Sequence, residues 1–383
     1  MGERKTEQYL AQLREEEGVL NLWSWSRIKS SKTDLYSYLL HYIIRVKADD
    51  RDNMYSLLGN VVHDNVENMH CGKITREEAL KNYKEKSIEF DIYGYKFNRS
   101  NANQNETIGK NYHYDNTHFF ENFKLQDGEN QMHEEFIRIR LGSQLVIGYI
   151  DHSMVIDGYL YITDYKTSSI YIKDKFDEEK GQLLLYALGK VQEGYPLEKI
   201  RVRWLFTKYV TLNSKMKNGK LRQSNVFRHD IGSKSYASVK MWLKHFEYND
   251  DDIDRFLDTM MLTNSLEHLP EQVRNCVWVE DCYVYVTVTQ EALNELKEDL
   301  KQQIFKVVKL EAEYNKTKDD RLFWVEVTDS NSYFFQNLCS YNRYKHKPLD
   351  EYYKNKESYR AEKIDDDDDD IDMDELLSDL GLV

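Results

Sequence analysis

The stretch that decides the fold runs from Glu134 to Tyr186 and reads EEFIRIRLGSQLVIGYIDHSMVIDGYLYITDYKTSSIYIKDKFDEEKGQLLLY. It contains three apolar runs rich in β-branched and aromatic residues, Phe136–Leu141, Leu145–Ile150 and Tyr159–Tyr165. The pairs Gly142-Ser143 and Asp157-Gly158 separate these runs, and both are typical of tight hairpin turns. We therefore predict three strands joined by two hairpins.

Two aspartates and a lysine lie at the ends of these predicted strands. Asp151 closes the second run, and Asp164 and Lys166 stand two apart at the end of the third, so they point to the same face of a strand. Mg²⁺ prefers oxygen ligands, and a bound metal ion activates water and neutralises charge on a phosphate. We interpret Asp151, Asp164 and the Tyr165 carbonyl as magnesium ligands, with Lys166 orienting water or stabilising the phosphorus centre. The alternative is a surface hairpin with an ordinary Asp–Lys pair.

The segments on either side add three further candidates. The helix predicted over 176–192 places Gln182 and Tyr186 one turn apart on one face, where they could contact a sugar–phosphate backbone. The alternative is a tyrosine packed in the core beside a solvated glutamine. A helix predicted over 52–69 carries His63, either as a ligand or as a packed histidine. Gly59, one turn earlier, permits the close approach of another element.

Composition indicates one large or two modest globular domains. The chain has 383 residues, of which 40% are hydrophobic and only 3 are proline. The net charge of −14 is concentrated in residues 361–383, which hold nine Asp and two Glu against one Lys. The rest is close to an ordinary balance, so a nucleic-acid partner is not excluded. Apolar runs of membrane-spanning length and a signal peptide are both lacking, and we expect a cytoplasmic protein without membrane association.

The rest of the chain is predicted to be mainly helical, with two further strands. The motif Thr75-Arg-Glu-Glu78 is a capping box that begins a helix in the polar segment 75–130. Strands are predicted at 199–210 and 282–288, and Ser24 or Ser26 is predicted to begin an early helix. Later helices are predicted at 234–247, 251–262, 290–312, 333–347 and 349–358.

Four pieces in a fixed order resemble the RecB-type branch of the PD-(D/E)xK nucleases, which includes AddB and the CRISPR-adaptation nucleases. The pieces are Ser24-Trp-Ser-Arg-Ile-Lys29, Gly59-x-x-x-His63, Gly148-Tyr-Ile-Asp151 with Asp164-Tyr-Lys166, and Gln182-x-x-x-Tyr186. The resemblance covers residues 20–190, and more loosely 282–312. It implies an α/β fold: a restriction-endonuclease-like core with a central mixed β-sheet flanked by helices. Residues 1–360 would form this nuclease domain, with 75–130 as a helical insertion.

The resemblance also implies roles for single residues. His63, Asp151 and Asp164 would hold the metal, Lys166 would be catalytic, and Gln182 and Tyr186 would contact DNA. A carboxylate before the first core strand is common in the family, which makes Glu134 or Glu135 a candidate for a supporting role. Many relatives carry an iron–sulfur cluster held by four cysteines. Here Cys339 stands alone in the corresponding C-terminal segment, so we expect Mg²⁺ or Mn²⁺ and no iron–sulfur cluster.

Basic residues and the acidic tail suggest partners. Basic side chains interleaved with aromatic ones are candidates for a DNA path, namely Arg138, Arg140, Lys173, Lys175, Arg201, Arg203, Lys208 and the loop 215–222. Phosphate contacts and stacking suit single-stranded DNA or duplex ends. Like charges repel in 361–383, so we expect a disordered tail that binds a protein partner, serves solubility alone, or occupies the DNA cleft.

The sequence therefore predicts a metal-dependent DNA nuclease, more specifically an exonuclease acting in replication, recombination or repair. The amino-acid usage, with 29 tyrosines and few prolines, suits a phage or a low-GC bacterium. If the protein is phage-encoded, its site of action would be the cytoplasm of the bacterial host. Two alternatives stay open: a non-catalytic scaffold that binds a replication partner through its tail, and an RNA-directed nuclease.

Overall fold

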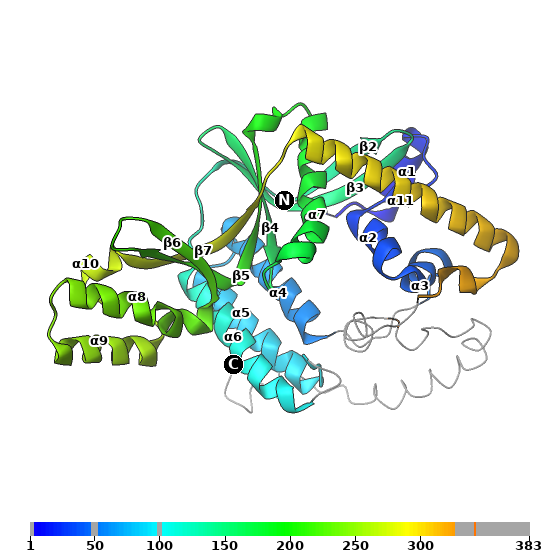
Figure 1. Ribbon diagram of the computed structural model, residues 1–383. Coiled ribbons are helices and arrows are strands. Elements are labelled where there is room, and N and C mark those ends of the chain that lie inside the picture. The colour runs from blue at the N-terminus through cyan, green and yellow to red at the C-terminus, as the bar shows by residue number, and fades with distance from the viewer. Residues whose placement is uncertain (1–3, 47–52, 98–101, 326–340, 342–383) are drawn as a thin grey trace.

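A mixed β-sheet forms the centre of the molecule (Figure 1). The computed structural model describes residues 4–46, 53–97, 102–325 and 341. Within them the strands are β1 (Leu22–Trp23), β2 (Glu129–Leu141), β3 (Gln144–Ile156), β4 (Tyr159–Lys166), β5 (Ile200–Lys215), β6 (Leu221–Phe227) and β7 (Val277–Val286). Their order is β1-β3-β4-β5-β6, with β2 also paired to β3 and β7 to β5. The β1–β3 and β4–β5 pairs are parallel and the others antiparallel, which confirms the predicted mixed sheet.

Helices cover both faces of this sheet. Their bounds are α1 (Glu7–Glu16), α2 (Trp25–Thr33), α3 (Leu35–Tyr38), α4 (Met54–His70), α5 (Arg76–Ile92), α6 (Asn105–Asn122), α7 (Lys173–Gln192), α8 (Ile231–His245), α9 (Asp250–Thr263), α10 (Glu271–Arg274) and α11 (Gln290–Thr317). One apolar core joins α2, α3, α7 and α11 to the sheet, and a second joins α4, α5 and α6 to the side of Tyr165 and Leu205. A third core packs α8, α9 and α10 against β5, β6 and β7, at the left of Figure 1.

Turn chemistry places the central hairpins where the sequence predicts them. Gly142 has φ +62°, and Asp157 and Gly158 have φ +51° and +74°, the left-handed values that such two-residue turns need. The strands are longer than predicted. In particular, β3 does not end at Asp151, because His152 to Ile156 pair with Thr163 to Tyr159 of β4. Asp151 therefore lies inside a strand, and its neighbours are fixed by hydrogen bonds on both sides.

Several helix predictions are confirmed, and one needs correction. Thr75 and Glu78 form the expected capping box at the start of α5, and Ser24 caps α2 by accepting from the Arg27 N–H. The early helix is not continuous, because Asp34 caps a new helix and the chain then widens into a π-helical turn at Leu39–Ile44. No helix in the described part of the chain is long and apolar enough to cross a membrane.

Several predictions concern the C-terminal part of the chain or its division into domains. The helices at 333–347 and 349–358, the Cys339 segment and the acidic tail lie, apart from Tyr341, outside the described residues. Helices α5 and α6 occupy most of the segment 75–130. The division into a domain over 1–360 and a tail stays a prediction.

Candidate active site

The predicted acidic residues meet where helix α4 approaches strands β3 and β4. The His63 Nδ1 atom lies 3.5 Å from the Oδ2 atom of Asp151. The same Oδ2 atom accepts a hydrogen bond of 3.0 Å from the backbone N–H of Tyr165. The Lys166 ammonium lies 2.5 Å from the Oδ2 atom of Asp164. Residues from one helix and two strands therefore converge at one place.

Glycine 59 allows this convergence. A Cβ atom built on Gly59 would lie 3.1 Å from the Thr167 Oγ1 atom, just beyond the end of β4, which is closer than most Cβ contacts. The helix can therefore lie against the end of the strand, and His63, one turn later, faces Asp151. A similar contact exists at Gly148, whose Cβ would lie 3.3 Å from the Tyr186 ring. Close approach at Gly59, expected from the sequence, is confirmed.

Burial and neighbouring charges shift the pKa values of Asp151 and Lys166. Asp164 is almost fully buried, with 1% of its surface exposed. Burial, followed by the charge of Asp164, raises the pKa of Asp151 from 3.8 to about 6, although His63 and Lys166 oppose the shift. Burial alone would lower the pKa of Lys166, but the charges of Asp164 and Asp151 outweigh it and raise that pKa. The lysine is therefore a charged ammonium at neutral pH.

Tyr186 and Gln182 come from α7, the helix that follows β4. The Gln182 Nε2 atom donates a 2.9 Å hydrogen bond to the Tyr186 hydroxyl, as expected for residues one turn apart. Tyr186 is buried in the main core, so its ring is a packing residue. Burial, and then the charges of Asp164 and Asp151, raise the pKa of its hydroxyl. That hydroxyl therefore lies within electrostatic reach of both acids.

The two candidate glutamates on β2 differ in their surroundings. Glu135 accepts a 2.9 Å hydrogen bond from the Ser153 hydroxyl and pairs with the buried Lys190. Glu134 has a left-handed φ of +45° and pairs with Arg4 at 3.4 Å. Glu135 is therefore tied to the scaffold, whereas Glu134 turns out of the regular strand.

One acidic residue was missed by the sequence reasoning. Glu67 stands one turn after His63 on α4, and burial followed by the charge of Glu134 raises its pKa. Both glutamates therefore lie in the same electronegative region. The spacing of four residues from His63 on one helix was the signal that could have found Glu67.

The two arginines predicted to contact DNA occupy different places. Arg138 is exposed and pairs with Glu17 at 3.5 Å. Arg203 is only 2% exposed, and its guanidinium donates to the Thr163 hydroxyl at 2.9 Å and to the Tyr285 hydroxyl at 3.1 Å. Its hydrogen-bonding groups link neighbouring strands. We therefore correct the prediction for Arg203, which stabilises the sheet and is not presented to a ligand.

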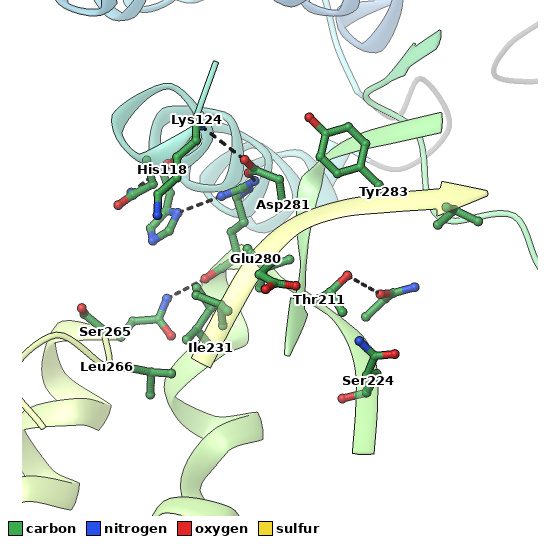
Figure 2. Close-up of a pocket in the computed structure, with 18 of the residues that line it drawn as sticks. His118, Lys124, Thr211, Ser224, Ile231, Ser265, Leu266, Glu280, Asp281 and Tyr283 are labelled. Carbon is green, nitrogen blue, oxygen red and sulfur yellow. Dashed lines mark hydrogen bonds and ion pairs between the residues drawn. The ribbon is translucent and has the colours of Figure 1, made fainter. Parts of the chain in front are cut away.

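A cavity of about 950 Å³ lies away from these acids, between α6, the strands β5–β7 and the loop after α9. Figure 2 shows His118, Asp281 and Tyr283 on its walls. Arg228 also lines the cavity and pairs with Asp281 at 2.7 Å, while Glu280 adds a second acid. Its lining is mixed in charge and contains neither Asp151 nor Asp164, so this cavity is a separate feature.

The residues at the convergence suit a divalent metal ion. Two carboxylates and an imidazole offer the oxygen and nitrogen atoms that can hold Mg²⁺ or Mn²⁺. The raised pKa of Asp151 reflects two acids placed together in a buried position, and a bound cation would relieve this repulsion. His63, Asp151 and Asp164 are the side chains that would hold the ion.

A family model and a solved structure are similar to this chain. The family model of the PD-(D/E)XK nuclease superfamily matches residues 22–319. A search of curated proteins finds no match. A solved structure from Eubacterium rectale, described as a "Putative exonuclease", is similar over 73% of this chain and 91% of its own, at 14% identity and a TM-score of 0.28. Such a loose superposition carries no weight, whereas the family model spans more than half of the chain. The chain therefore belongs to the PD-(D/E)XK nuclease superfamily.

Proposed function

We propose that this protein is a divalent-metal-dependent deoxyribonuclease of the RecB-type branch, acting as an exonuclease in DNA replication, recombination or repair. One observation carries the proposal: His63, Asp151, Asp164 and Lys166, separated by up to about a hundred residues in sequence, lie together at one edge of β3 and β4. Family membership supports nuclease chemistry. The choice of metal, of DNA and of exonucleolytic action is the finer part of the proposal.

Three side chains and one backbone carbonyl would hold the metal ion. Asp151, Asp164 and His63, with the Tyr165 carbonyl, hold Mg²⁺ or Mn²⁺. When bound, such an ion lowers the pKa of water and neutralises charge on the phosphate. The Tyr165 N–H fixes Asp151 through its hydrogen bond, so this carboxylate is oriented before substrate arrives.

Lys166 supports the transition state as a cation. Because the neighbouring acids raise its pKa, Lys166 keeps its proton at neutral pH and can donate hydrogen bonds but cannot accept a proton from water. Its role is therefore to orient the attacking water and to stabilise the charge that builds on the phosphate oxygens. About a fifth of its side chain, 21%, is exposed, which leaves it reachable by substrate.

Substrate contacts are proposed for two groups of residues. The Gln182 amide donates a hydrogen bond to the hydroxyl of the buried Tyr186 beside the acids. Gln182 would contact the sugar–phosphate backbone, and Tyr186 would orient it through this hydrogen bond. Arg138 is exposed on β2 and would supply a phosphate contact after leaving Glu17. Such contacts read no base sequence, which fits single-stranded DNA or duplex ends.

The test is a degradation assay on end-labelled single-stranded DNA, duplex DNA, RNA and closed circular DNA, with Mg²⁺, Mn²⁺ or a chelator. We expect linear DNA to be shortened from an end, circular DNA to survive, and the chelator to stop the reaction. Cleavage of the circle would contradict exonucleolytic action. Degradation of RNA in place of DNA would favour the RNA-directed alternative.

A further inference from the structure

Three histidines lie together on the face of the sheet that α4 covers. His70 is the last residue of α4, while His133 and His152 are directly paired across β2 and β3. Each offers a ring nitrogen, and these three atoms all lie within 4.8 Å of one another. The ring centre of His152 lies 4.4 Å from that of His70 and 4.4 Å from that of His133, while His70 and His133 are 5.3 Å apart. The rings of His133 and His152 are stacked. We refer to these residues as the three-histidine cluster.

Four ring nitrogens of this cluster are buried and lack a hydrogen-bond partner in the described part of the chain. His133 is 5% exposed and His152 is 2% exposed. Within the described residues, His70 Nε2, His152 Nε2 and both nitrogens of His133 make no hydrogen bond. A buried polar atom left without a partner is costly, and native proteins rarely keep several together. A single ligand bound by all three rings would satisfy one of these nitrogens in each ring.

The other ring nitrogen of His152 indicates the kind of ligand. The Nδ1 atom of His152 lies 2.9 Å from the Tyr165 hydroxyl. A histidine that binds a metal through one nitrogen typically donates the N–H of the other to an oxygen, which fixes its tautomer. The Tyr165 hydroxyl is suited to this role, and it leaves His152 Nε2 free for an ion.

We propose that the three-histidine cluster of His70, His133 and His152 binds a divalent transition-metal ion of the Zn²⁺ type. Imidazole nitrogens prefer Zn²⁺, Co²⁺, Ni²⁺ or Cu²⁺ to Mg²⁺, so this site differs in chemistry from the carboxylate site. Zn–N bonds are about 2.0–2.1 Å, so the rings must draw together slightly around the ion. Three protein ligands leave one position for water.

The place of the cluster indicates what the ion does. His70 stands two turns after His63 on α4, and His152 follows Asp151 on β3. An ion held by His70, His133 and His152 links the end of α4 to both strands of the β2–β3 hairpin. It therefore fixes the helix that carries His63 against the strand that carries Asp151. This inference rests on the histidines alone and does not require the proposed nuclease function.

The experiment measures metal binding to untagged, metal-stripped protein. Wild type is titrated with Zn²⁺ by calorimetry and with Co²⁺ by visible absorption, which reports histidine coordination directly. We expect one ion per chain at the three-histidine cluster, counted as the ion whose binding is lost in the cluster variants, with spectral bands of low-symmetry Co²⁺ and a Zn²⁺-dependent rise in the thermal midpoint. His133→Ala should weaken binding by at least about 100-fold, since even outer residues of such sites are worth about 10–100-fold.

Matched variants keep the test decisive. His70→Gln, at the half-buried end of α4, replaces His133→Ala if the latter does not fold, and His245→Ala removes an exposed histidine on α8 as the control. Asp164→Asn should abolish nuclease activity yet leave Zn²⁺ and Co²⁺ binding unchanged. Wild type that binds neither ion, or ligand variants that bind as tightly as the control, would overturn the proposal.

Discussion

Asp151 shows how a single residue can lower stability in order to build a site. Its carboxylate is placed beside the buried Asp164, and the two repel when both are ionised. In metal-free protein at neutral pH, Asp151→Asn keeps the shape of the side chain and removes both the buried charge and its repulsion with Asp164. We expect the free energy of unfolding to rise by at most about 3 kcal/mol, the equivalent of a shift from 3.8 to about 6 at about 1.4 kcal/mol per pKa unit.

Denaturant unfolding in a chelator checks this expectation. Mg²⁺ should raise the thermal midpoint of wild type and leave that of Asp151→Asn unchanged, because the variant lacks a ligand. Asp157→Asn, in the exposed hairpin turn, is the control and should behave as wild type. A variant that is less stable than wild type in the chelator would show that the two acids do not repel in the folded protein.

His118 gives a prediction about pH. Burial, and then the charge of Arg228, lower the pKa of His118 from 6.5 to about 4. Between these values the unfolded chain binds a proton that the folded chain does not, so this histidine makes stability fall as pH falls from about 6.5 to about 4. We expect His118→Gln to lose less stability over that range, and urea unfolding at about pH 7 and about pH 5 measures it.

The same substitution at exposed His245 is the matched control for this measurement. Burial also lowers the pKa of His70 and of His133 to about 4, so wild type and both variants should lose some stability in acid. The contribution of His118 is the difference between the two variants in how steeply the free energy of unfolding changes with pH. Equal slopes would contradict a neutral His118 beside Arg228.

At the scale of elements, the absence of a side chain at Gly181 lets helix α7 pack closely against helix α2. A Cβ atom on Gly181 would lie 2.2 Å from the Trp25 ring of α2, a distance that non-bonded Cβ contacts essentially never show. Alanine gains up to about 1 kcal/mol of helix propensity over glycine, but overpacking costs about 1–3 kcal/mol and a rigid indole cannot bend away.

We therefore expect Gly181→Ala to be net destabilising by about 1–2 kcal/mol. Because α7 also carries Gln182, activity should fall together with stability. Lys180→Ala, the preceding position on the same helix, should change stability by less than about 0.5 kcal/mol. Chemical unfolding monitored by tryptophan fluorescence compares the two, and a Gly181→Ala variant as stable as wild type would show that α2 can move aside.

The elements predicted best from sequence are those whose signals are local. The two hairpin turns and the capping box at Thr75 depend on residues within a few positions of one another, and all are found. The predicted end of the strand at Ile150 is wrong, because the extension of β3 to Ile156 depends on pairing with β4. Arg203 looked like a DNA contact by charge, but its partners Thr163 and Tyr285 come from neighbouring strands, which a linear sequence does not place.

The site could be predicted in part. His63, Asp151, Asp164 and Lys166 were chosen from motif spacing and resemblance, and they lie together. Glu67 and the three-histidine cluster were not chosen, because their meaning appears only when α4 is laid against β2 and β3. The histidines stand at 70, 133 and 152, and such separations match no metal-binding motif in the sequence.

At the scale of the whole molecule, negative charge is distributed unevenly. Residues 361–383 contain eleven acidic residues and one lysine. Because these like charges repel one another and anionic DNA, deletion of 361–383 should leave the thermal midpoint unchanged and tighten DNA binding at low salt. Thermal unfolding and a salt series of binding titrations check both parts. A lower midpoint would place the segment in the folded domain.

The central claim is that Lys166 and the acids beside it cleave phosphodiester bonds. The direct measurement is the single-turnover rate of release of labelled nucleotides from a DNA end with Mn²⁺, for wild type, Lys166→Ala and Lys306→Ala, the last an exposed lysine of α11. We predict a loss of about 100–1,000-fold for Lys166→Ala, the size expected when one transition-state donor is removed, and no loss for Lys306→Ala. Equal rates for wild type and Lys166→Ala would contradict the account.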